Sequence, residues 1–390
     1  GTTALILSYM SFAIGYIAGP FGAIFFGHIG DRKGRKVTMY ASLLMMGIST
    51  SIIGILPPAA SAGVGVVIVL QLMRLAQCFG RGGTWGGGIL MAYENVPENK
   101  RSFYAAIPQI GLPIGFGLSS ILIAVPTLLL PEDIFFTWGW RIPFLAAIIL
   151  TVIVIRQKGE MMETEDYKKA QAKLEAEEAE GKKHKVGFIP MVKGYWKTLL
   201  LGCGTRWVDG TFYNIFIVWI LSYCINWLGM PLIQTYIITI IACIFKIPFT
   251  LFGGWCAQKL GNTRTFVIGA LASAVLSIPT LKVIELSKGN LAITIIGIVL
   301  GWSIAYNLIW AVISSLWSSY FETEVRYSGI SFVYHVPSFL VAGMVPTICT
   351  LLINYGKGDT IYVGIYSTVV ALISAACALA LKARHDRGEK

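Results

Sequence analysis

Two arginines stand in the middle of a long apolar run in this chain of 390 residues. Arg74 and Arg81 lie seven residues apart within residues 64–92, and this spacing places both side chains on one face of a helix. A charge at the centre of a lipid bilayer costs about 2.5–3.5 kcal/mol, so two on one face are expected to point into a polar cavity. There the guanidinium groups would bind a small organic anion such as a carboxylate. Pairing with acids elsewhere in the chain is the alternative.

A second charged group lies in the apolar run 198–225. Arg206 and Asp209 are three residues apart there, and Tyr213 falls on the same side of a helix. Asp209 is the only acid in the interior of an apolar run. A local ion pair would make both charges tolerable within a membrane. In the alternative interpretation, Arg206 holds the anion while Asp209 takes up a proton.

Four polar side chains complete the predicted ligand site. Gln109 and Tyr213 would form hydrogen bonds with hydroxyl or carbonyl groups of the ligand. Lys246 lies in the middle of an apolar run and would place a further cation near the anion. His335 is a second candidate for proton transfer, and a hydrogen-bonded packing role is its alternative.

Eleven apolar runs must position these residues, and a helix needs roughly 20 residues to cross a membrane. The chain is 55% hydrophobic and 13% charged, a composition too apolar for a soluble globular protein. We therefore expect an all-α membrane protein. The predicted helices lie near residues 3–26, 37–56, 64–92, 102–126, 138–156, 198–225, 232–253, 265–284, 291–318, 328–353 and 360–381.

The basic residues are distributed unevenly between the two sides of the predicted helices. Alternate connections hold most of the 31 Lys and Arg, whereas the connections between them hold only Lys288 and Lys357. Because basic loops stay on the cytoplasmic side, this pattern places the linker at 157–197 and the C-terminus in the cytoplasm and the chain in the plasma (inner) membrane. The net charge of +11 is thus explained by topology, and no nucleic-acid partner is expected.

The connection Gly27–Lys36 (GHIGDRKGRK) must be a short loop at the membrane surface, where its glycines let two helix ends approach closely. Asp31 would accept hydrogen bonds from a neighbouring helix N-terminus, at which Ser328 is the expected N-cap. Glu94 would pair with arginines of this loop. We expect the network to hold the cytoplasmic face closed. Its predicted members are Gly27, Asp31, Arg32, Gly34, Arg35, Glu94, Arg101 and Ser328.

The segment Gly254–Thr263 (GWCAQKLGNT) is a degenerate copy of this loop, with two glycines and Lys259 at matching positions. The second copy follows the second helix of its half, whereas the first copy follows the first helix present. The sequence therefore predicts that a helix preceding residue 1 is missing, and that the intact protein has two halves of six helices with the ligand between them. The expected organisation is a transmembrane half at 1–156, a cytoplasmic linker with a charged helix at 157–197, and a transmembrane half with a short basic tail at 198–390.

Five stretches together resemble one known family. They are FGHIGDRKGRK (26–36), RLAQCFGRGGTWGGG (74–88), YENVPENKRSFY (93–104), WGWRIPF (138–144) and RYSG (326–329). They are similar to the major facilitator superfamily, in its metabolite:proton symporter branch of shikimate, α-ketoglutarate, citrate and proline/betaine transporters. The resemblance implies a secondary active transporter that moves a shikimate- or dicarboxylate-like anion by alternating access, coupled to protons.

Two positions depart from the family pattern. Thr84 stands in GGTWGG, where family members usually read GGEWGG, and Gln258 replaces the acid of the second loop. The loss of carboxylates suits a facilitator or an anion exchanger, in which the substrate itself balances the cations. This alternative to proton-coupled symport stays open.

No residue pattern predicts an enzyme or a metal site. The seven cysteines are expected to pack as small side chains, and no His, Cys or Asp cluster has metal-ligand or nucleophile spacing. No cofactor is expected beyond the proton as a coupling ion. The expected partners are a small organic anion and the lipid bilayer, and the chain is expected to be a monomer. A channel or sensory protein is the alternative class.

Overall fold

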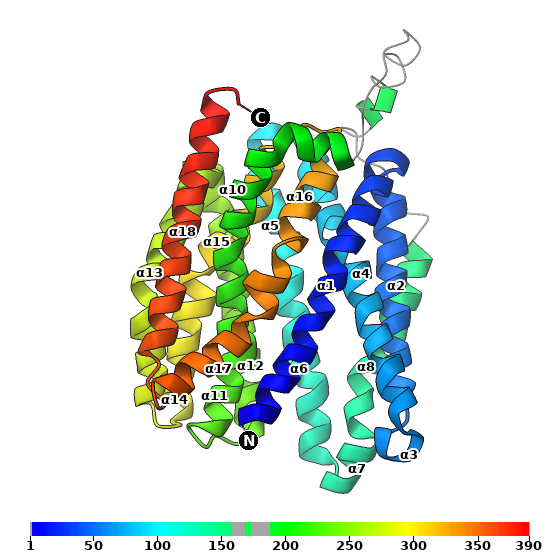
Figure 1. Ribbon diagram of the computed structural model, residues 1–390, viewed down its shortest axis with the longest axis vertical. Coiled ribbons are helices and arrows are strands. Elements are labelled where there is room, and N and C mark those ends of the chain that lie inside the picture. Colours follow the sequence, from blue (N-terminus) through cyan, green and yellow to red (C-terminus); the bar gives the residue numbers. More distant parts are fainter. Residues whose placement is uncertain (1, 158–167, 170, 173–187, 390) are drawn as a thin grey trace.

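The computed structural model describes residues 2–157, 168–169, 171–172 and 188–389, and most of the predicted linker helix lies outside these ranges. All regular structure in them is helical, and the helices form one elongated bundle (Figure 1). Eleven helical segments of the described residues are long and apolar enough to cross a membrane. The all-α, multi-pass fold predicted from the apolar runs is therefore confirmed.

The helices before the linker form five of these spans. Pro108 cannot donate a backbone hydrogen bond, and the fourth span is broken there into α5, η2 and α6. In chain order the elements are α1 (Thr2–Lys33), α2 (Arg35–Ile55), α3 (Ala59–Ala62), α4 (Val64–Glu94), η1 (Glu98–Lys100), α5 (Arg101–Ala106), η2 (Pro108–Ile110), α6 (Gly111–Leu129), α7 (Glu132–Thr137), η3 (Gly139–Arg141) and α8 (Ile142–Arg156).

The helices after the linker form six spans, and three of these contain a π-helical segment. Such segments are rare and frequently occur at functional sites. In chain order the elements are α10 (Phe188–Asn214), η5 (Ile215–Trp219), α11 (Ile220–Asn226), α12 (Leu232–Leu260), α13 (Asn262–Leu286), α14 (Leu291–Ile298), η6 (Val299–Ala305), α15 (Asn307–Ser318), α16 (Arg326–His335), η7 (Phe339–Gly343), α17 (Val345–Tyr355) and α18 (Ile361–Asp386).

The two groups of helices meet along two seams. In the first seam, α1 packs against α16 and η7, and Figure 1 shows α1 beside α16. In the second, α5 and α6 pack against α12, and α5 also packs against α15. Within the first group α4 packs against α1 and α2, and within the second group α18 packs against α10 and α13. Any ligand site between the groups must therefore lie between these seams.

Glycines permit the close approach of α1 and α4. A Cβ on Gly22 would lie 2.0 Å from the carbonyl oxygen of Phe79, and a Cβ on Gly82 would lie 2.4 Å from the backbone nitrogen of Ala23. Real Cβ atoms do not approach backbone atoms so closely, so a larger residue at either position would force the helices apart. This contact fixes Arg81, the neighbour of Gly82, against α1.

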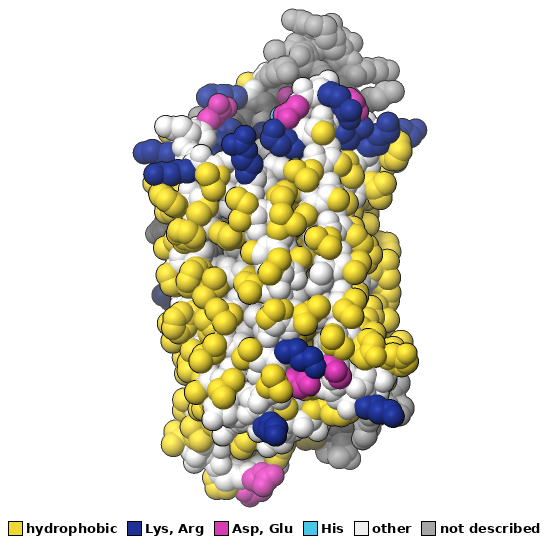
Figure 2. Space-filling view, turned by 90° about the vertical axis from the view of Figure 1, so that its left-hand side faces the viewer, with side chains coloured by type: hydrophobic (Ala, Val, Ile, Leu, Met, Phe, Trp, Pro, Cys, Tyr) yellow, Lys and Arg dark blue, Asp and Glu magenta, His cyan; other side chains and the backbone are white. Residues whose placement is uncertain are grey.

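Basic side chains gather at one end of the bundle, above a broad band of exposed hydrophobic residues (Figure 2). We call this the basic end; it holds the α1–α2 connection and the C-terminus (Figure 1). A single glycine separates the two helices in each of the repeated loops, and these two glycines have similar backbone angles. Gly34, between α1 and α2, has φ 102° and ψ 157°, and Gly261, between α12 and α13, has φ 90° and ψ 151°. Both conformations favour glycine, which explains why the degenerate second copy keeps it.

At the opposite end, an ion cluster joins α13 to the start of α18. Lys282 Nζ lies 2.7 Å from Asp359 Oδ1 and 3.0 Å from Glu285 Oε2. The hydrogen bond from Lys282, together with one from the backbone N–H of Ile361, lowers the pKa of Asp359. The cluster thus holds together a connection that the apolar helices alone would not fix.

Candidate functional site

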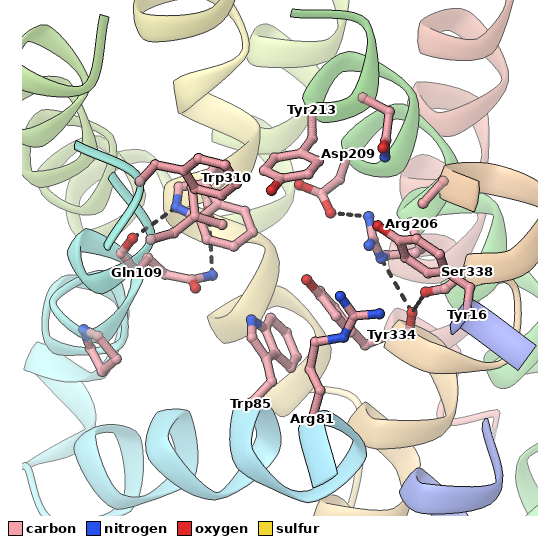
Figure 3. Close-up of a pocket in the computed structure, with 15 residues that line it drawn as sticks. Tyr16, Arg81, Trp85, Gln109, Arg206, Asp209, Tyr213, Trp310, Tyr334 and Ser338 are labelled. Carbon is pink, nitrogen blue, oxygen red and sulfur yellow. Dashed lines mark hydrogen bonds and ion pairs between the residues drawn. The ribbon is translucent and has the colours of Figure 1, made fainter. Parts of the chain in front are cut away.

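A cavity of about 310 Å³ lies between the two groups of helices (Figure 3). Residues from α1, α4, η2, α6, α10, α15, α16, η7 and the α16–η7 connection line it, so neither group alone forms the site. The lining combines aromatic rings with three charged side chains. The lining residues are Tyr16, Arg81, Trp85, Pro108, Gln109, Leu112, Phe116, Arg206, Asp209, Tyr213, Asn214, Trp310, Tyr334, Ser338 and Ala342.

Arg206 and Asp209 form a buried ion pair on one wall of the cavity. Their relative exposures are 5% and 1%, so the pair is almost fully removed from solvent. The hydroxyl of Tyr306 donates a second hydrogen bond to the Asp209 carboxylate. Arg206 Nε donates to the carbonyl oxygen of Tyr334 over 3.3 Å, and its guanidinium lies 4.2 Å from the centre of the Tyr334 ring. The orientation of both charges is thus fixed from several sides.

Arg81 faces this wall from α4 (Figure 3). Its guanidinium carbon lies 4.7 Å from the centre of the Tyr16 ring, and Nη2 is 3.8 Å from the sulfur of Cys78. Among the described residues no carboxylate forms an ion pair with Arg81. The cavity lining therefore carries two cations and one anion, a composition that favours an anionic ligand.

Three polar atoms at the cavity are buried and have no hydrogen-bond partner in the described structure. They are Nε of Arg81, the indole Nε1 of Trp85 and the amide Oδ1 of Asn214. Buried polar atoms are usually satisfied, so these two donors and one acceptor suit a ligand that carries both an acidic oxygen and a donor group. The stacked rings of Trp85 and Tyr334, with centres 4.1 Å apart, provide a flat apolar surface beside them.

Gln109 and Trp310 join the two groups of helices across the cavity. Gln109 Nε2 donates to the carbonyl oxygen of Trp310 over 3.2 Å, and Trp310 Nε1 donates to the carbonyl oxygen of Gln109 over 3.1 Å. Tyr213 lies nearby, edge to face with Phe116 at 5.7 Å between ring centres. Gln109 and Tyr213 therefore both line the cavity, and their hydrogen bonds to a ligand stay a prediction.

Arg74 does not line this cavity. It lies about two helical turns along α4 from Arg81 and borders a second cavity, of about 400 Å³, whose lining also includes Gln77, Thr50 and Phe144. The shared helix face predicted for the two arginines is correct, since Arg81 lines both cavities. The structure thus places Arg74 at the second cavity, and its role in binding the ligand stays a prediction.

Lys246 and His335 also lie outside the central cavity lining. Lys246 is fully buried in α12, behind Trp310 and Tyr306. His335 packs against α1, where its Nδ1 would be 3.3 Å from a Cβ on Gly19. Both residues lie within a span, where a position can face a neighbouring helix instead of the cavity.

At the basic end, the first seam is closed by Asp31. Its carboxylate accepts a hydrogen bond from the backbone N–H of Ser328 over 3.2 Å and another from the Ser328 hydroxyl. Gly27 lies against the same residue, since a Cβ there would be 3.2 Å from the Cα of Ser328. Asp31 thus meets a helix N-terminus as predicted, but the N-cap of α16 is Val325, and Ser328 is the third residue of the helix.

Two further contacts of α16 complete this closure. Arg326 Nη1 lies 3.0 Å from Glu94 Oε1 in a buried ion pair, and the hydroxyl of Tyr327 donates to the carbonyl oxygen of Gly83. Sequence reasoning expected Glu94 to pair within the first helix group and did not find Arg326. The side chains of Arg32 and Arg35 lie outside the described residues.

Arg101 lies at the basic end beside α4. Its Nη1 is 3.8 Å from Glu98 Oε1, and its guanidinium lies 5.2 Å from the centre of the Tyr93 ring. The second seam is closed instead by Gln258, whose Oε1 accepts from the backbone N–H of Phe103 over 3.3 Å. Gln258 therefore contacts the start of α5 in the way that Asp31 contacts the start of α16.

Comparison with known sequences identifies the family. Residues 2–344 match the sequence profile of the Major Facilitator Superfamily. The inner membrane metabolite transport protein YhjE of Escherichia coli is 33% identical over 99% of this chain and 86% of its own length. The chain belongs to the Major Facilitator Superfamily.

Other members of the superfamily support the branch that the motifs predicted. The shikimate transporter of Escherichia coli is 30% identical over 97% of this chain and 84% of its own length. The proline/betaine transporter of Salmonella typhimurium is 27% identical over 98% of this chain and 76% of its own length. These relatives are transporters, so the expectation that the protein is not an enzyme is confirmed.

Solved structures of the superfamily share the fold. The proton:xylose symporter XylE bound to 6-bromo-6-deoxy-D-glucose superimposes with a TM-score of 0.75, at 15% identity over 95% of this chain and 85% of that chain. A partially occluded inward open conformation of XylE from Escherichia coli gives a TM-score of 0.68, at 16% identity over 97% and 87% of the two chains. The major facilitator fold is therefore shared at 15–16% sequence identity.

The sequence did not predict the aromatic part of the cavity. Tyr16, Trp85, Trp310 and Tyr334 come from four helices, and aromatic residues are frequent throughout the apolar runs. Two of these residues could have been found from the sequence. Trp85 lies in the GGTWGG stretch that resembles the family motif, and Tyr334 directly precedes His335, which was already a candidate. Thr84, in the same stretch, does not line the cavity, because its hydroxyl lies 3.2 Å from Ser42 Oγ on α2.

Proposed function

We propose that this protein is a secondary active carrier of a small organic anion, a carboxylate such as a shikimate- or dicarboxylate-like metabolite. One observation carries the proposal: Arg81 has no ion-pair partner among the described residues and faces the Arg206–Asp209 pair across the cavity between the two groups of helices. A carboxylate between Arg81 and Arg206 would accept hydrogen bonds from both guanidinium groups. Membership in a family of metabolite transporters supports the same conclusion.

The remaining polar groups would recognise the rest of the substrate. The free acceptor of Asn214 and the hydroxyl of Tyr213 suit substrate hydroxyl groups, and the indole N–H of Trp85 suits a carboxylate or carbonyl oxygen. The paired rings of Trp85 and Tyr334 suit the apolar face of a small ring. Gln109 would keep its two bonds to Trp310 and contact the substrate with its remaining atoms.

The carrier would work by alternating access between halves at residues 1–156 and 198–390. Asp31, Glu94 and their partners on α16 join the two groups of helices at the basic end, and we assign them the role of a gate. Since basic loops are retained in the cytoplasm, we place the basic end and the C-terminus on the cytoplasmic side. Opening towards the cytoplasm would then require these contacts to break, while Gln258 and Phe103 separate or slide at the second seam.

Proton coupling would proceed through Asp209. A substrate carboxylate that competes for Arg206 would leave Asp209 with fewer donors and able to take up a proton, so anion and proton would move together. Exchange without protons is the second candidate. It is favoured by the firm attachment of Asp209 to Arg206 and Tyr306 and by the absence of another carboxylate among the described lining residues. His335 stays a further candidate for proton transfer, and no cofactor is needed in either mechanism.

Counterflow in proteoliposomes tests the proposal. Vesicles loaded with unlabelled shikimate, citrate or 2-oxoglutarate should accumulate the same labelled carboxylate, whereas glycine betaine should not be accumulated. Arg81→Gln should reduce counterflow at least tenfold, because one of the two proposed carboxylate contacts is lost. Accumulation of glycine betaine without any carboxylate would contradict the proposal.

A pH gradient separates the two coupling modes. A symporter should accumulate carboxylate in empty vesicles when the outside is acidic, and a protonophore should abolish this uptake. An exchanger should show counterflow that neither the gradient nor the protonophore changes.

A further inference from the structure

Lys246 is a completely buried lysine just behind the cavity wall. Its relative exposure is 0%, and it lies near the middle of α12. The ammonium nitrogen lies 4.4 Å from the centre of the Trp302 ring, 4.3 Å from that of Tyr306 and 6.0 Å from that of Trp310. Three aromatic faces therefore surround it, an arrangement that stabilises a cation through the electron-rich ring faces.

The hydrogen bonds of this ammonium are to neutral groups. Nζ donates to Asn307 Oδ1 over 3.0 Å and lies 3.5 Å from the carbonyl oxygen of Trp302. Among the described residues it forms no ion pair with a carboxylate. A buried charge without a counter-ion is costly, and an apolar residue of similar size is often neutral or better for stability. Folding alone therefore gives no reason for a lysine at this position.

Two of the three rings around Lys246 connect it to the ligand site. The hydroxyl of Tyr306 donates to the Asp209 carboxylate, so the ring that contacts the ammonium also binds the acid of the cavity. Trp310 lines the cavity and forms the paired hydrogen bonds with Gln109. A change at Lys246 would thus reach the ligand through a single layer of side chains.

We propose that Lys246 is a specificity-determining residue that selects anions without touching the substrate. In its protonated form the amine adds to the potential of Arg81 and Arg206 in the cavity. It also strengthens the bond from Tyr306 to Asp209, because a cation on a phenol ring makes the hydroxyl a better donor. The inference rests on the proposed function of an anion carrier.

The test compares Lys246→Met with Lys259→Met in the full chain. Both lysines belong to α12 and contact aromatic rings, but Lys259 is exposed at the basic end, with its ammonium 4.6 Å from the Trp255 ring centre. Binding of shikimate and of its uncharged methyl ester is measured by equilibrium titration, and thermal unfolding is followed without ligand. Lys246→Met should weaken shikimate binding about tenfold, which corresponds to about 1.4 kcal/mol.

Binding of the ester and the unfolding temperature distinguish an electrostatic role of Lys246 from a role in packing. Lys246→Met should leave binding of the ester within twofold and should leave Tm unchanged or raise it, while Lys259→Met should change none of the three. Equal loss of acid and ester, unchanged shikimate binding, or a lowered Tm would each overturn the role of Lys246. A wild-type protein that does not prefer shikimate to its ester would instead overturn the proposed function itself.

Discussion

At the scale of single residues, the charges of the cavity differ in how they are compensated. Arg206 and Asp209 neutralise each other's charge in a buried ion pair, and both have lost their hydration. Arg81 forms no ion pair among the described residues. The first two residues should therefore matter for stability as well as for binding. Arg81 should matter chiefly for binding, because its removal leaves no buried charge unpaired.

This difference gives a prediction for Arg206. Arg206→Gln leaves the buried Asp209 with the Tyr306 hydroxyl as its remaining donor among the contacts described, and breaking a buried pair in this way costs about 3–5 kcal/mol of unfolding free energy. Adding Asp209→Asn removes the uncompensated charge and should restore most of that stability, although neither variant should bind the carboxylate. Thermal unfolding and equilibrium binding measure the two effects.

Arg81→Gln serves as the matched control for this experiment. It should lose carboxylate affinity by at least tenfold while Tm stays close to that of the wild type. A double variant as unstable as Arg206→Gln alone would show that the pair is not held together by its charges.

The positions of some of these residues could be predicted from the sequence, and those of others could not. The spacing of Arg206, Asp209 and Tyr213 within one helix predicted their common face correctly, because helical geometry alone decides it. Arg74 and Lys246 were expected at the same site and do not line the central cavity. Their placement depends on the length of the cavity and the rotation of α12, and neither follows from local periodicity.

At the scale of elements, two loop copies close two seams in the same way. Asp31, at the end of α1, accepts a hydrogen bond from the backbone at the start of α16, and Gln258, at the end of α12, accepts one from the backbone at the start of α5. The loop repeat predicted that the two loops correspond in sequence, but not that Gln258 contacts the start of α5. The sequence could not predict that Arg326 would pair with Glu94, since that contact joins segments more than two hundred residues apart.

The first closure should depend on charge, because a carboxylate at a helix N-terminus is worth about 0.3–1 kcal/mol more than a neutral acceptor. Asp31→Asn keeps the acceptor oxygen and removes the charge. We expect it to slow counterflow several-fold while the equilibrium affinity for the substrate changes less than twofold, since the cavity itself is untouched.

The control for this change is Asp133→Asn, an exposed acid in the first turn of α7. It should alter neither rate nor affinity. An equal loss of transport and binding in Asp31→Asn would count against a gating role for the network at the basic end.

At the scale of the whole molecule, the sequence predicted the number of spans and the membrane class. Apolar length and charge distribution decide these features, and both can be read from a single chain. The cavity could not be predicted in the same way, because Tyr16, Trp310 and Tyr334 meet only when helices distant in the sequence pack together. Apolar patterning does not distinguish a helix face that meets a neighbour from one that faces a ligand.

Alternating access makes a prediction about the molecule as a unit, namely that transport requires the first seam to separate at the basic end. A Cβ on Gly27 would lie 3.5 Å from the Cβ of Ser328, within the range of about 3.5–4.5 Å found in disulfides. The paired substitution Gly27→Cys and Ser328→Cys should therefore form a cross-link on oxidation. The oxidised protein should bind substrate but fail to transport it, and reduction should restore transport to the level of the single variants. These singles are the needed baseline, because Ser328→Cys alone removes the hydroxyl that bonds to Asp31. Unchanged transport by protein whose cross-link is confirmed by mass spectrometry would show that this seam need not open, and would contradict alternating access through the basic end.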